Sequence, residues 1–209
     1  MLRQKNDPYA IKAAFFDAQA REAWAVKNSD PDEMKKFDRL FAVTGPLAGL
    51  RVLEPGCGIG RLTERLVAEV GRLGYIVAVD ISPRMVAHAR INLSDYEKVE
   101  IHLGPVEEII GFENYFDVVI CHQVFPHFED QENALTKISN MLKPGGRIVI
   151  SNFISSAEIK KMHSRAGSAV ANDLMPPPQT MQTMIEQCGF EIEYWADDSD
   201  GYLLKANLI

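Results

Sequence analysis

The chain has 209 residues, of which 46% are apolar and 24% charged, and its formal net charge is −7. This length suits one α/β domain, which we place over residues 1–209, and the acidic charge disfavours nucleic acid, since phosphate binding needs a concentrated basic face. Three widely spaced cysteines without a C-x-x-C pair, and no signal-peptide core or long apolar run, predict a cytoplasmic protein without a membrane span.

Residues 8–43 are predicted to form two amphipathic helices. The apolar residues that recur at three- and four-residue spacing are Phe15, Phe16, Ala20, Trp24, Met34, Phe37, Leu40 and Phe41. The break between the helices lies at 28–33, where Asp30 is a candidate N-cap and Pro31 a suitable first helical residue. The aromatic residues could pack on a sheet of this chain or against a partner subunit, so a monomer and a homodimer both stay open.

The stretch RVLEPGCGIGRLTERLV, residues 51–67, reads as a strand, a glycine turn and a helix. Gly56, Gly58 and Gly60 form the turn, and the helix that follows carries apolar residues on one face, namely Leu62, Leu66 and Val70. This arrangement brings backbone close to an adenosine-type ligand. A dinucleotide fingerprint would place its third glycine at position 61, which is Arg61, so a nicotinamide-dependent oxidoreductase is disfavoured.

The next apolar run, YIVAVDIS, ends in Asp80. An acidic residue at the tip of the second strand is placed to accept hydrogen bonds from ribose hydroxyls. Ser82 and Pro83 are then predicted to cap and begin another helix.

Glu54, the G-x-G-x-G turn and Asp80 make the chain resemble the class I S-adenosylmethionine-dependent methyltransferases, whose first motif reads much like LEPGCGIG. The resemblance implies a Rossmann-like, doubly wound α/β sheet of seven strands, mostly parallel with a C-terminal antiparallel pair. It also implies that residues 8–43 contribute to a lid. The cofactor-binding residues it implies in this region are Glu54, Gly56, Cys57, Gly58, Gly60, Asp80, Ile81 and Met85.

VEIHLGPVEEI is predicted to form a strand with Val99, Ile101 and Leu103 on one buried face. In the resembling family an acidic or amide side chain near the end of this strand bonds the exocyclic amine of adenine. That role falls on Glu107 or on the adjacent Glu108, and Val106 could stack on the ring.

FDVVICHQVFPHFED contains a continuous apolar run at 116–121, which is typical of a central strand buried on both faces. Ligands in such sheets bind beyond the carboxyl ends of the strands. By the resemblance, the backbone of His122 or Gln123 approaches the methionine portion of the cofactor and Phe125 borders it. In ENALTKISNMLKPGGRIVISNF we predict a helix face, with Lys143 in its last turn, and a strand at 147–153. That face is formed by Leu135, Ile138 and Leu142.

Residues 155–179 form an insertion that the minimal fold does not need, and such segments commonly build a substrate pocket or its lid. Its notable polar residues are His163 and Asp173. Because histidine accepts protons readily near neutral pH, His127 and His163 are the candidate bases, if a base is needed. His163 is equally compatible with a helix end or the surface. The histidine spacing predicts no metal site.

The last 20 residues, FEIEYWADDSDGYLLKANLI, are predicted to form a hairpin around an Asp-Gly turn. Together with LKPGG and FDVVICH, they extend the resemblance to the small-molecule methyltransferases that include ubiquinone and menaquinone biosynthesis enzymes. The expected activity is methyl transfer from S-adenosylmethionine to an oxygen, carbon or sulfur atom of a small molecule, leaving S-adenosylhomocysteine. The alternative is a regulator that binds the cofactor without catalysis.

Overall fold

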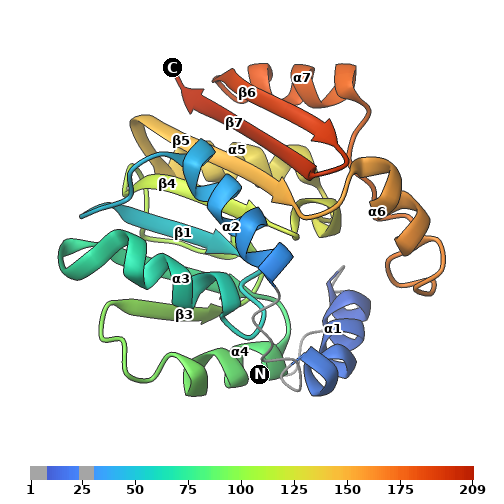
Figure 1. The fold of residues 1–209 in the computed structure, drawn as a ribbon, viewed down its shortest axis with the longest axis horizontal. Helices are drawn as coiled ribbons and strands as arrows, with labels where there is room; N and C mark the ends of the chain where they lie inside the picture. Colours follow the sequence, from blue (N-terminus) through green and yellow to red (C-terminus); the bar gives the residue numbers. More distant parts are fainter. Residues whose placement is uncertain (1–8, 24–30) are drawn as a thin grey trace.

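The computed structural model describes residues 9–23 and 31–209, and in them the chain forms a seven-stranded sheet between two layers of helices (Figure 1). The strand order is β3-β2-β1-β4-β5-β7-β6. β7 runs antiparallel to both β5 and β6, and the other pairs are parallel. The predicted fold class is therefore confirmed. The strands are β1 (Arg51–Pro55), β2 (Tyr75–Asp80), β3 (Val99–Leu103), β4 (Phe116–His122), β5 (Leu142–Asn152), β6 (Phe190–Asp198) and β7 (Gly201–Leu208).

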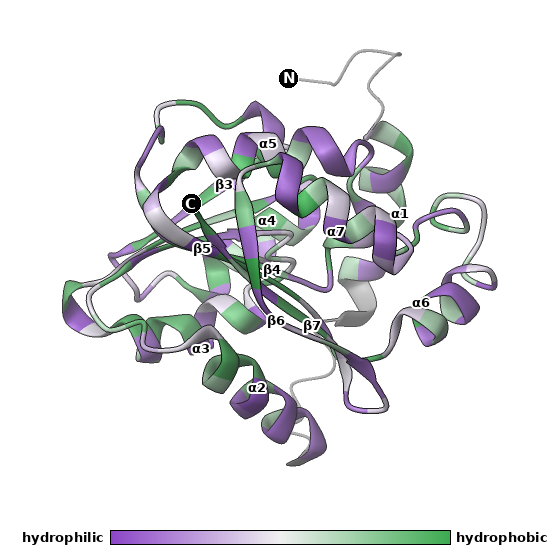
Figure 2. Cartoon of the chain, turned by 90° about the horizontal axis from the view of Figure 1, so that it is seen from above, coloured by the Kyte–Doolittle hydropathy of each residue, from purple (hydrophilic) through white to green (hydrophobic). Residues whose placement is uncertain are grey.

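Helices cover both faces of the sheet, as the view from above shows (Figure 2). Side chains of α2 and α3 pack on one face, and side chains of α5 and α7 pack on the other. The helices are α1 (Ala10–Ala23), α2 (Pro31–Thr44), α3 (Arg61–Val70), α4 (Pro83–Asn92), α5 (Gln131–Met141), α6 (Ser156–His163) and α7 (Pro178–Gln187). Short 3₁₀ turns are η1 (Gly71–Leu73), η2 (Val106–Glu108) and η3 (Phe125–His127).

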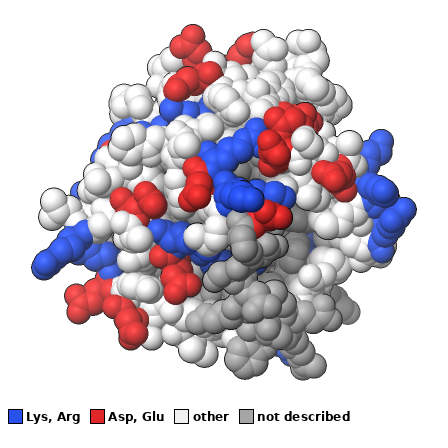
Figure 3. All heavy atoms as spheres, viewed as in Figure 1, with Lys and Arg blue, Asp and Glu red and all other residues white. Residues whose placement is uncertain are grey.

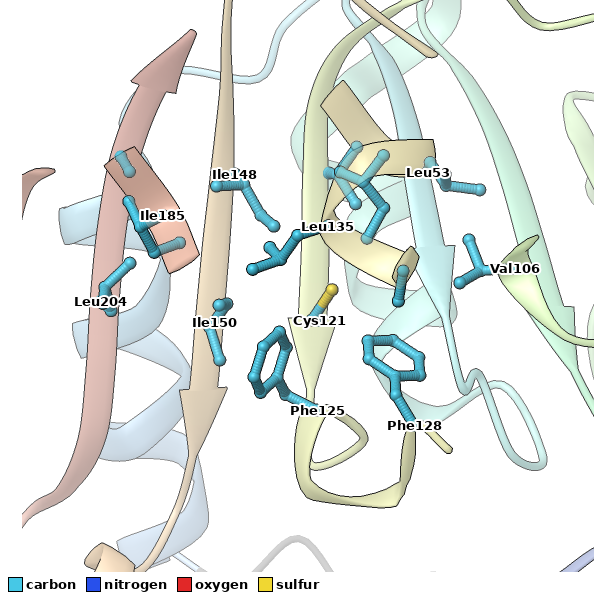
Figure 4. Packing of buried hydrophobic residues seen from close by; sticks show 14 of the residues in the cluster. Leu53, Val106, Cys121, Phe125, Phe128, Leu135, Ile148, Ile150, Ile185 and Leu204 are labelled. Atoms are coloured by element: carbon cyan, nitrogen blue, oxygen red, sulfur yellow. The ribbon is translucent and has the colours of Figure 1, made fainter. Parts of the chain in front are cut away.

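Successive side chains of the central strands point to opposite faces of the sheet and pack into two separate hydrophobic clusters. Val52 belongs to the cluster under α2 and α3, whereas Leu53 belongs to the cluster under α5 and α7, part of which Figure 4 shows. This follows from the period of two along a strand and explains why the central strands are apolar throughout. The predicted face of α3 is confirmed, since its residues Leu62, Leu66 and Val70 are all buried.

The strand order reverses between β1 and β4, which are hydrogen-bonded neighbours although β2 and β3 separate them in sequence. The chain after β1 turns to one side of the sheet, and the chain after β4 turns to the other. The loops after these strands therefore diverge and leave room for a ligand at their carboxyl ends.

Two expectations about local structure were wrong. β3 lies at the edge of the sheet, so Val99 and Ile101 are only half-buried and Leu103 is 50% exposed. Lys143 lies in β5 and not in a helix, because α5 ends at Met141 and Leu142 already pairs with Phe116 in the sheet.

The helix capped by Ser82 and begun by Pro83 is confirmed as α4, where the Ser82 hydroxyl accepts a hydrogen bond from the Met85 amide. α2 begins at Pro31, as predicted. The predicted N-cap Asp30 and the helical Trp24 lie outside the described residues.

On the described part of the face in Figure 3, basic and acidic side chains are interspersed, and the basic ones do not gather into one patch. Across residues 9–23 and 31–209, no helix combines the length and the apolar character that crossing a bilayer requires.

Candidate functional site

A cavity of about 300 Å³ opens where the strand order reverses, above the carboxyl ends of β1, β2 and β4. Most of the residues predicted to bind a cofactor meet there, although they come from four separate stretches of sequence. Those that line the cavity are Glu54, Gly56, Cys57, Gly58, Asp80, Ile81, Met85, Val106, Glu107, His122 and Gln123.

Two predicted residues do not line it. Gly60 caps α3 with a φ of 91°, and a Cβ at this position would lie 2.7 Å from Leu93 Cδ1, so this glycine serves packing between α3 and α4. Phe125 is fully buried in the core. Phe128, the next aromatic residue of the segment, is buried in the same cluster (Figure 4) and also lines the cavity. The 3₁₀ turn at η3 carries Phe125 inward, which the sequence pattern did not indicate.

The glycine turn exposes its backbone to the cavity. Gly56 and Gly58 have φ values of 70° and 55°, which residues with a side chain rarely adopt. A Cβ on Gly56 would collide with the Val124 side chain, whereas a Cβ on Gly58 would meet no atom within 4 Å. The space in front of Gly58 is therefore open for a ligand.

Asp80 fastens this turn to the second strand. Its carboxylate accepts hydrogen bonds from the Gly58 amide at 2.8 Å and the Ser82 amide at 2.8 Å. Burial raises the pKa of this carboxyl, and the two amide bonds oppose the rise. Each carboxylate oxygen has a second lone pair, so Asp80 can still accept hydrogen bonds from a ligand in the cavity.

Glu54 lies deeper, below the turn, and is 2% exposed. The Thr63 hydroxyl donates to its Oε2 at 2.6 Å. Burial raises the pKa of Glu54 to about 8, and the nearby Asp80 charge adds to the rise while Thr63 opposes it. Burial, more than the Asp80 charge, therefore keeps Glu54 mostly protonated at neutral pH.

Glu107 closes the opposite wall. Its Oε1 accepts a hydrogen bond from the Tyr9 hydroxyl at 2.6 Å, and Tyr9 lies immediately before α1. Its Oε2 is buried and has no hydrogen-bond partner among the described residues. A buried carboxylate oxygen without a partner is costly, and a donor on a ligand would remove that cost.

The end of β4 is held in an unusual conformation. Gln123 has a φ of 55°, and its amide donates to the Ser151 carbonyl at 2.8 Å. His122 Nδ1 lies 2.8 Å from the Ser151 hydroxyl, and the ring packs against Phe37 and Phe153. Burial, with the nearby Arg61 charge, lowers the pKa of His122 to about 3, so this ring is neutral at physiological pH.

Both predicted base histidines lie at one end of the cavity, but only His127 lines it. His163 is 4% exposed and packs against His127, with ring centroids 4.8 Å apart and ring planes tilted by 37°. His127 Nδ1 lies 2.7 Å from Asp173 Oδ2, and the Phe16 ring of α1 packs edge-on against the His127 ring.

Sequence reasoning missed several residues of the site. Lys12 on α1 is buried against Asp173 and Glu129, and Tyr9 reaches Glu107. These contacts join residues about 100 positions apart or more, and no local spacing marks them. Other cavity residues that were not assigned a role are Gln19, Glu33, Phe37, Arg61, Val124 and Phe128.

Comparisons with known proteins agree on one family. Residues 47–199 match the family model for a methyltransferase domain. The chain is 28% identical over 173 residues to the ubiquinone/menaquinone biosynthesis C-methyltransferase UbiE of Vibrio cholerae, covering 71% of this chain and 66% of that protein. It is 31% identical over 110 residues to a ubiquinone biosynthesis O-methyltransferase of Xylella fastidiosa, covering 52% of this chain and 44% of that protein. The alignments thus span two thirds or less of these relatives.

Among solved structures, an S-adenosylmethionine-dependent methyltransferase from Aquifex aeolicus superposes with a TM-score of 0.70. The superposition covers 98% of this chain and 100% of that one at 18% identity, so it shows a shared fold.

Proposed function

The chain belongs to the class I S-adenosylmethionine-dependent methyltransferases, and from this and the cavity we propose that it methylates a small molecule. The observation that carries the proposal is the convergence of the glycine turn, Asp80 and Glu107 on one cavity with a histidine–carboxylate pair at its far end.

The residues present fit S-adenosylmethionine. The open space in front of Gly58 suits the close approach of a ligand to backbone, and Asp80 retains acceptor capacity for ribose hydroxyls. The unpartnered Oε2 of Glu107 suits the exocyclic amine of adenine, with Val106 and Met85 as apolar neighbours of the ring. Gln123 and His122, which also line the cavity, are the residues that would contact the methionine portion of the cofactor.

The bound cofactor would supply a methyl group already activated by the sulfonium charge. The chain therefore has to hold the acceptor in line, exclude water and, where the acceptor carries a proton, remove it. The aromatic side chains of Phe16, Phe37 and Phe128 line the cavity on the acceptor side. His127 is the cavity residue suited to take the proton.

Charge favours a neutral acceptor. The ionisable residues among the described lining are Glu33, Glu54, Asp80, Glu107 and Arg61. Arg61 is paired with Glu33, and Glu54, with a pKa of about 8, is mostly protonated at neutral pH. The two remaining carboxyl groups, on Asp80 and Glu107, suit a cationic cofactor and disfavour an acceptor that carries phosphate. We therefore infer a neutral, partly aromatic acceptor such as a hydroxylated ring or a quinone-like ring, methylated at oxygen or carbon; a thiol is the third possibility.

The second candidate is a regulator that binds S-adenosylmethionine or S-adenosylhomocysteine without transferring a methyl group. The cavity extends past the predicted cofactor residues to Phe16 and His127. A site that only bound the cofactor would not need this extension or a histidine held by a buried carboxylate.

The experiment has two stages. Isothermal titration calorimetry should show micromolar binding of S-adenosylmethionine and S-adenosylhomocysteine and no binding of NADH. Transfer of radiolabelled methyl groups is then assayed against a panel of neutral phenols, quinols and thiols, with phosphorylated phenols as the charge control. Binding without transfer to any panel member would favour the regulator, and NADH binding alone would refute the family-based reading of the cavity.

We also propose that the protein is cytoplasmic and that it is a monomer or a homodimer. The three cysteines are free thiols, which supports a reducing, cytoplasmic setting. Multi-angle light scattering of the purified chain distinguishes the monomer from the homodimer.

A further inference from the structure

Three elements that are distant in sequence converge on the His127 ring. Asp173, in the segment between α6 and α7, bonds its Nδ1 at 2.7 Å. Lys12 of α1 contacts the other Asp173 oxygen at 3.0 Å, Glu129 at 3.0 Å and the His127 carbonyl at 2.9 Å. His163 of α6 packs against the ring at a tilt of 37°, and its own Nδ1 bonds the Asp173 carbonyl at 2.5 Å. Among the described residues, the titratable groups that act on His127 are Asp173, His163 and Lys12, and all three belong to this cluster.

The buried members of the cluster are balanced in charge. The Lys12, His127 and Asp173 side chains are 7%, 14% and 10% exposed, whereas the Glu129 side chain is 34% exposed and reaches solvent. Lys12 therefore offsets the charge of the carboxylate that bonds His127, and this buried pair is neutral without a proton on the ring.

The carboxylate also selects one tautomer of the ring. Asp173 ionises readily, because the bonds from His127 and Lys12 outweigh the effect of burial and lower its pKa. An ionised carboxylate only accepts, so Nδ1 must carry the hydrogen and Nε2 must carry the lone pair. Among the described residues, no hydrogen bond is made to Nε2, while the His127 side chain lines the cavity.

The neutral state of the ring is the resting state. Burial lowers the pKa of His127, the bond to Asp173 opposes this, and the nearby Lys12 charge reinforces it. At neutral pH the ring is therefore unprotonated and ready to accept a proton, which is the condition that general-base catalysis requires.

We propose that Asp173 is a positioning residue that holds His127 as the Nδ1–H tautomer, that Lys12 holds Asp173 in place, and that His127 Nε2 accepts the proton of the methyl acceptor. The inference rests on the proposed methyl transfer. In that step the acceptor nucleophile forms its bond to the methyl carbon as the carbon–sulfur bond breaks, and the sulfur keeps that electron pair. The proton of the acceptor passes to Nε2 and later to solvent, so the acceptor belongs to the class that carries an ionisable hydrogen at or conjugated with the reacting atom, such as a phenol or a quinol.

The arrangement depends on α1. Lys12 is supplied by the same helix whose Asp17 accepts hydrogen bonds from the Ser82 hydroxyl and the Arg84 amide beside the cofactor end of the cavity. Tyr9, just before that helix, bonds Glu107. Docking of α1 therefore closes the cofactor end and completes the base at the acceptor end together.

The tautomer can be tested without knowing the acceptor. Long-range ¹H–¹⁵N correlation spectra of ¹⁵N-histidine-labelled protein distinguish protonated from unprotonated ring nitrogens, and the chain has five histidines. His127→Gln identifies the His127 signals. At pH 7.5 we expect a protonated Nδ1 and an unprotonated Nε2. An Nε2–H tautomer in the wild type would overturn the proposal.

Two variants test the supporting residues. In Asp173→Asn, the amide oxygen is expected to turn to Lys12 and the amide nitrogen to His127, so the tautomer should switch to Nε2–H. In Lys12→Met, the tautomer should persist while the pKa of His127 rises, because a neighbouring cation is lost. Asp95→Asn, at an exposed position, is the control and should change neither. An unchanged tautomer in Asp173→Asn would refute the positioning role, and Lys12→Met tests the cluster independently if the first variant does not fold.

Calorimetry separates this inference from the proposed function. Asp173→Asn should bind S-adenosylhomocysteine within about twofold of the wild type, and once a phenol from the panel is found to be methylated, its kcat should fall about 100-fold or more. The pH at which kcat reaches half its maximum should also shift. If the wild type does not bind S-adenosylhomocysteine, the proposed function is contradicted. If Asp173→Asn binds it normally and keeps the kcat and pH profile of the wild type, only the positioning role is contradicted.

Discussion

Gly56 and Val124 meet across the point where the strand order reverses, and a Cβ added to Gly56 would lie 2.3 Å from Val124 Cγ2. The contact joins the loop after β1 to the loop after β4. Both residues line the cavity.

Gly56→Ala is therefore expected to lower the free energy of unfolding by about 2–4 kcal/mol, from the positive φ and from overpacking. Val124→Ala in the same chain should recover part of this loss, because it removes the methyl groups that collide. Urea unfolding of the two single variants and the double variant measures the coupling. Strictly additive losses would show that the two side chains do not compete for this space.

Substitutions at Gly58 and Gly145 can separate the effect of backbone strain from the effect of a lost ligand contact. Both have a positive φ, 55° and 74°, and a Cβ on either would meet no atom within 4 Å, but only Gly58 lines the cavity. Gly58→Ala and Gly145→Ala should each cost about 1 kcal/mol of stability. Only Gly58→Ala should weaken S-adenosylmethionine binding, by about tenfold or more in calorimetry. Equal affinities would mean that the ligand does not approach the turn closely.

Asp80→Ala should weaken S-adenosylmethionine binding by about 1–3 kcal/mol, the scale of a lost charge-assisted hydrogen bond. The substitution also leaves the Gly58 and Ser82 amides without their acceptor, so some loss of stability is expected with it. Asp95→Ala, at an exposed position, supplies the control for a lost carboxylate. Calorimetric affinity equal to that of the wild type would remove Asp80 from the site.

We expect Glu107 to accept a hydrogen bond from the exocyclic amine of adenine. Changing the ligand tests this more directly than changing the residue. S-inosylhomocysteine carries a carbonyl oxygen where S-adenosylhomocysteine carries the amine, so it would face the unpartnered Oε2 with another acceptor. The wild type should bind it at least about tenfold more weakly.

Glu107→Ala should lose most of this discrimination, and Glu108→Ala should keep it. Glu108 is exposed and does not line the cavity. Discrimination that survives in Glu107→Ala but not in Glu108→Ala would reverse the assignment of the two residues.

Glu54 should make stability depend on pH in an unusual direction. Its pKa rises from 4.5 to about 8 on folding, so between these values the native state holds a proton that the unfolded state releases. Stability is therefore lost as pH rises through this window, by up to about 1.4 kcal/mol per pH unit from this group.

Glu54→Gln, which cannot ionise, should remove this component. Urea unfolding at pH 5.5, 6.5 and 7.5 should give a free energy of unfolding that falls more steeply in the wild type than in the variant. Parallel slopes would show that Glu54 is ionised in the folded protein. Thr63→Val supplies a second variant that removes the hydrogen bond to Glu54 and keeps its carboxyl group.

The local chemistry of the sequence was sufficient where the signal lay within one turn or one strand. The strand, glycine turn and helix at 51–67 follow from residue type and spacing, and so does the cap at Ser82. It was insufficient where two similar residues compete. In the segment F-P-H-F, nothing in the sequence says which phenylalanine reaches the cavity. Both are buried in the core, and after the 3₁₀ turn at η3 only Phe128 also lines the cavity.

Lys143 shows a different limit. Its spacing suits the last turn of a helix, but the strand pairing of Leu142 with Phe116 ends α5 earlier. A ladder contact between residues 26 positions apart thus overrides a local helical pattern, which is a common way for tertiary structure to set element boundaries.

The sequence by itself determined the family, the seven-stranded sheet and most of the cavity lining, because periodicity and the glycine turn are local and the strand order follows from a small set of allowed topologies. Only the tertiary structure decided which side chains surround the candidate base His127. Lys12, His127, Asp173 and His163 are separated by up to 161 positions in the chain. They meet because α1 and the segment after α6 fold back over the same strand ends, and a buried charge cluster of this kind exists only once all of its members are in place.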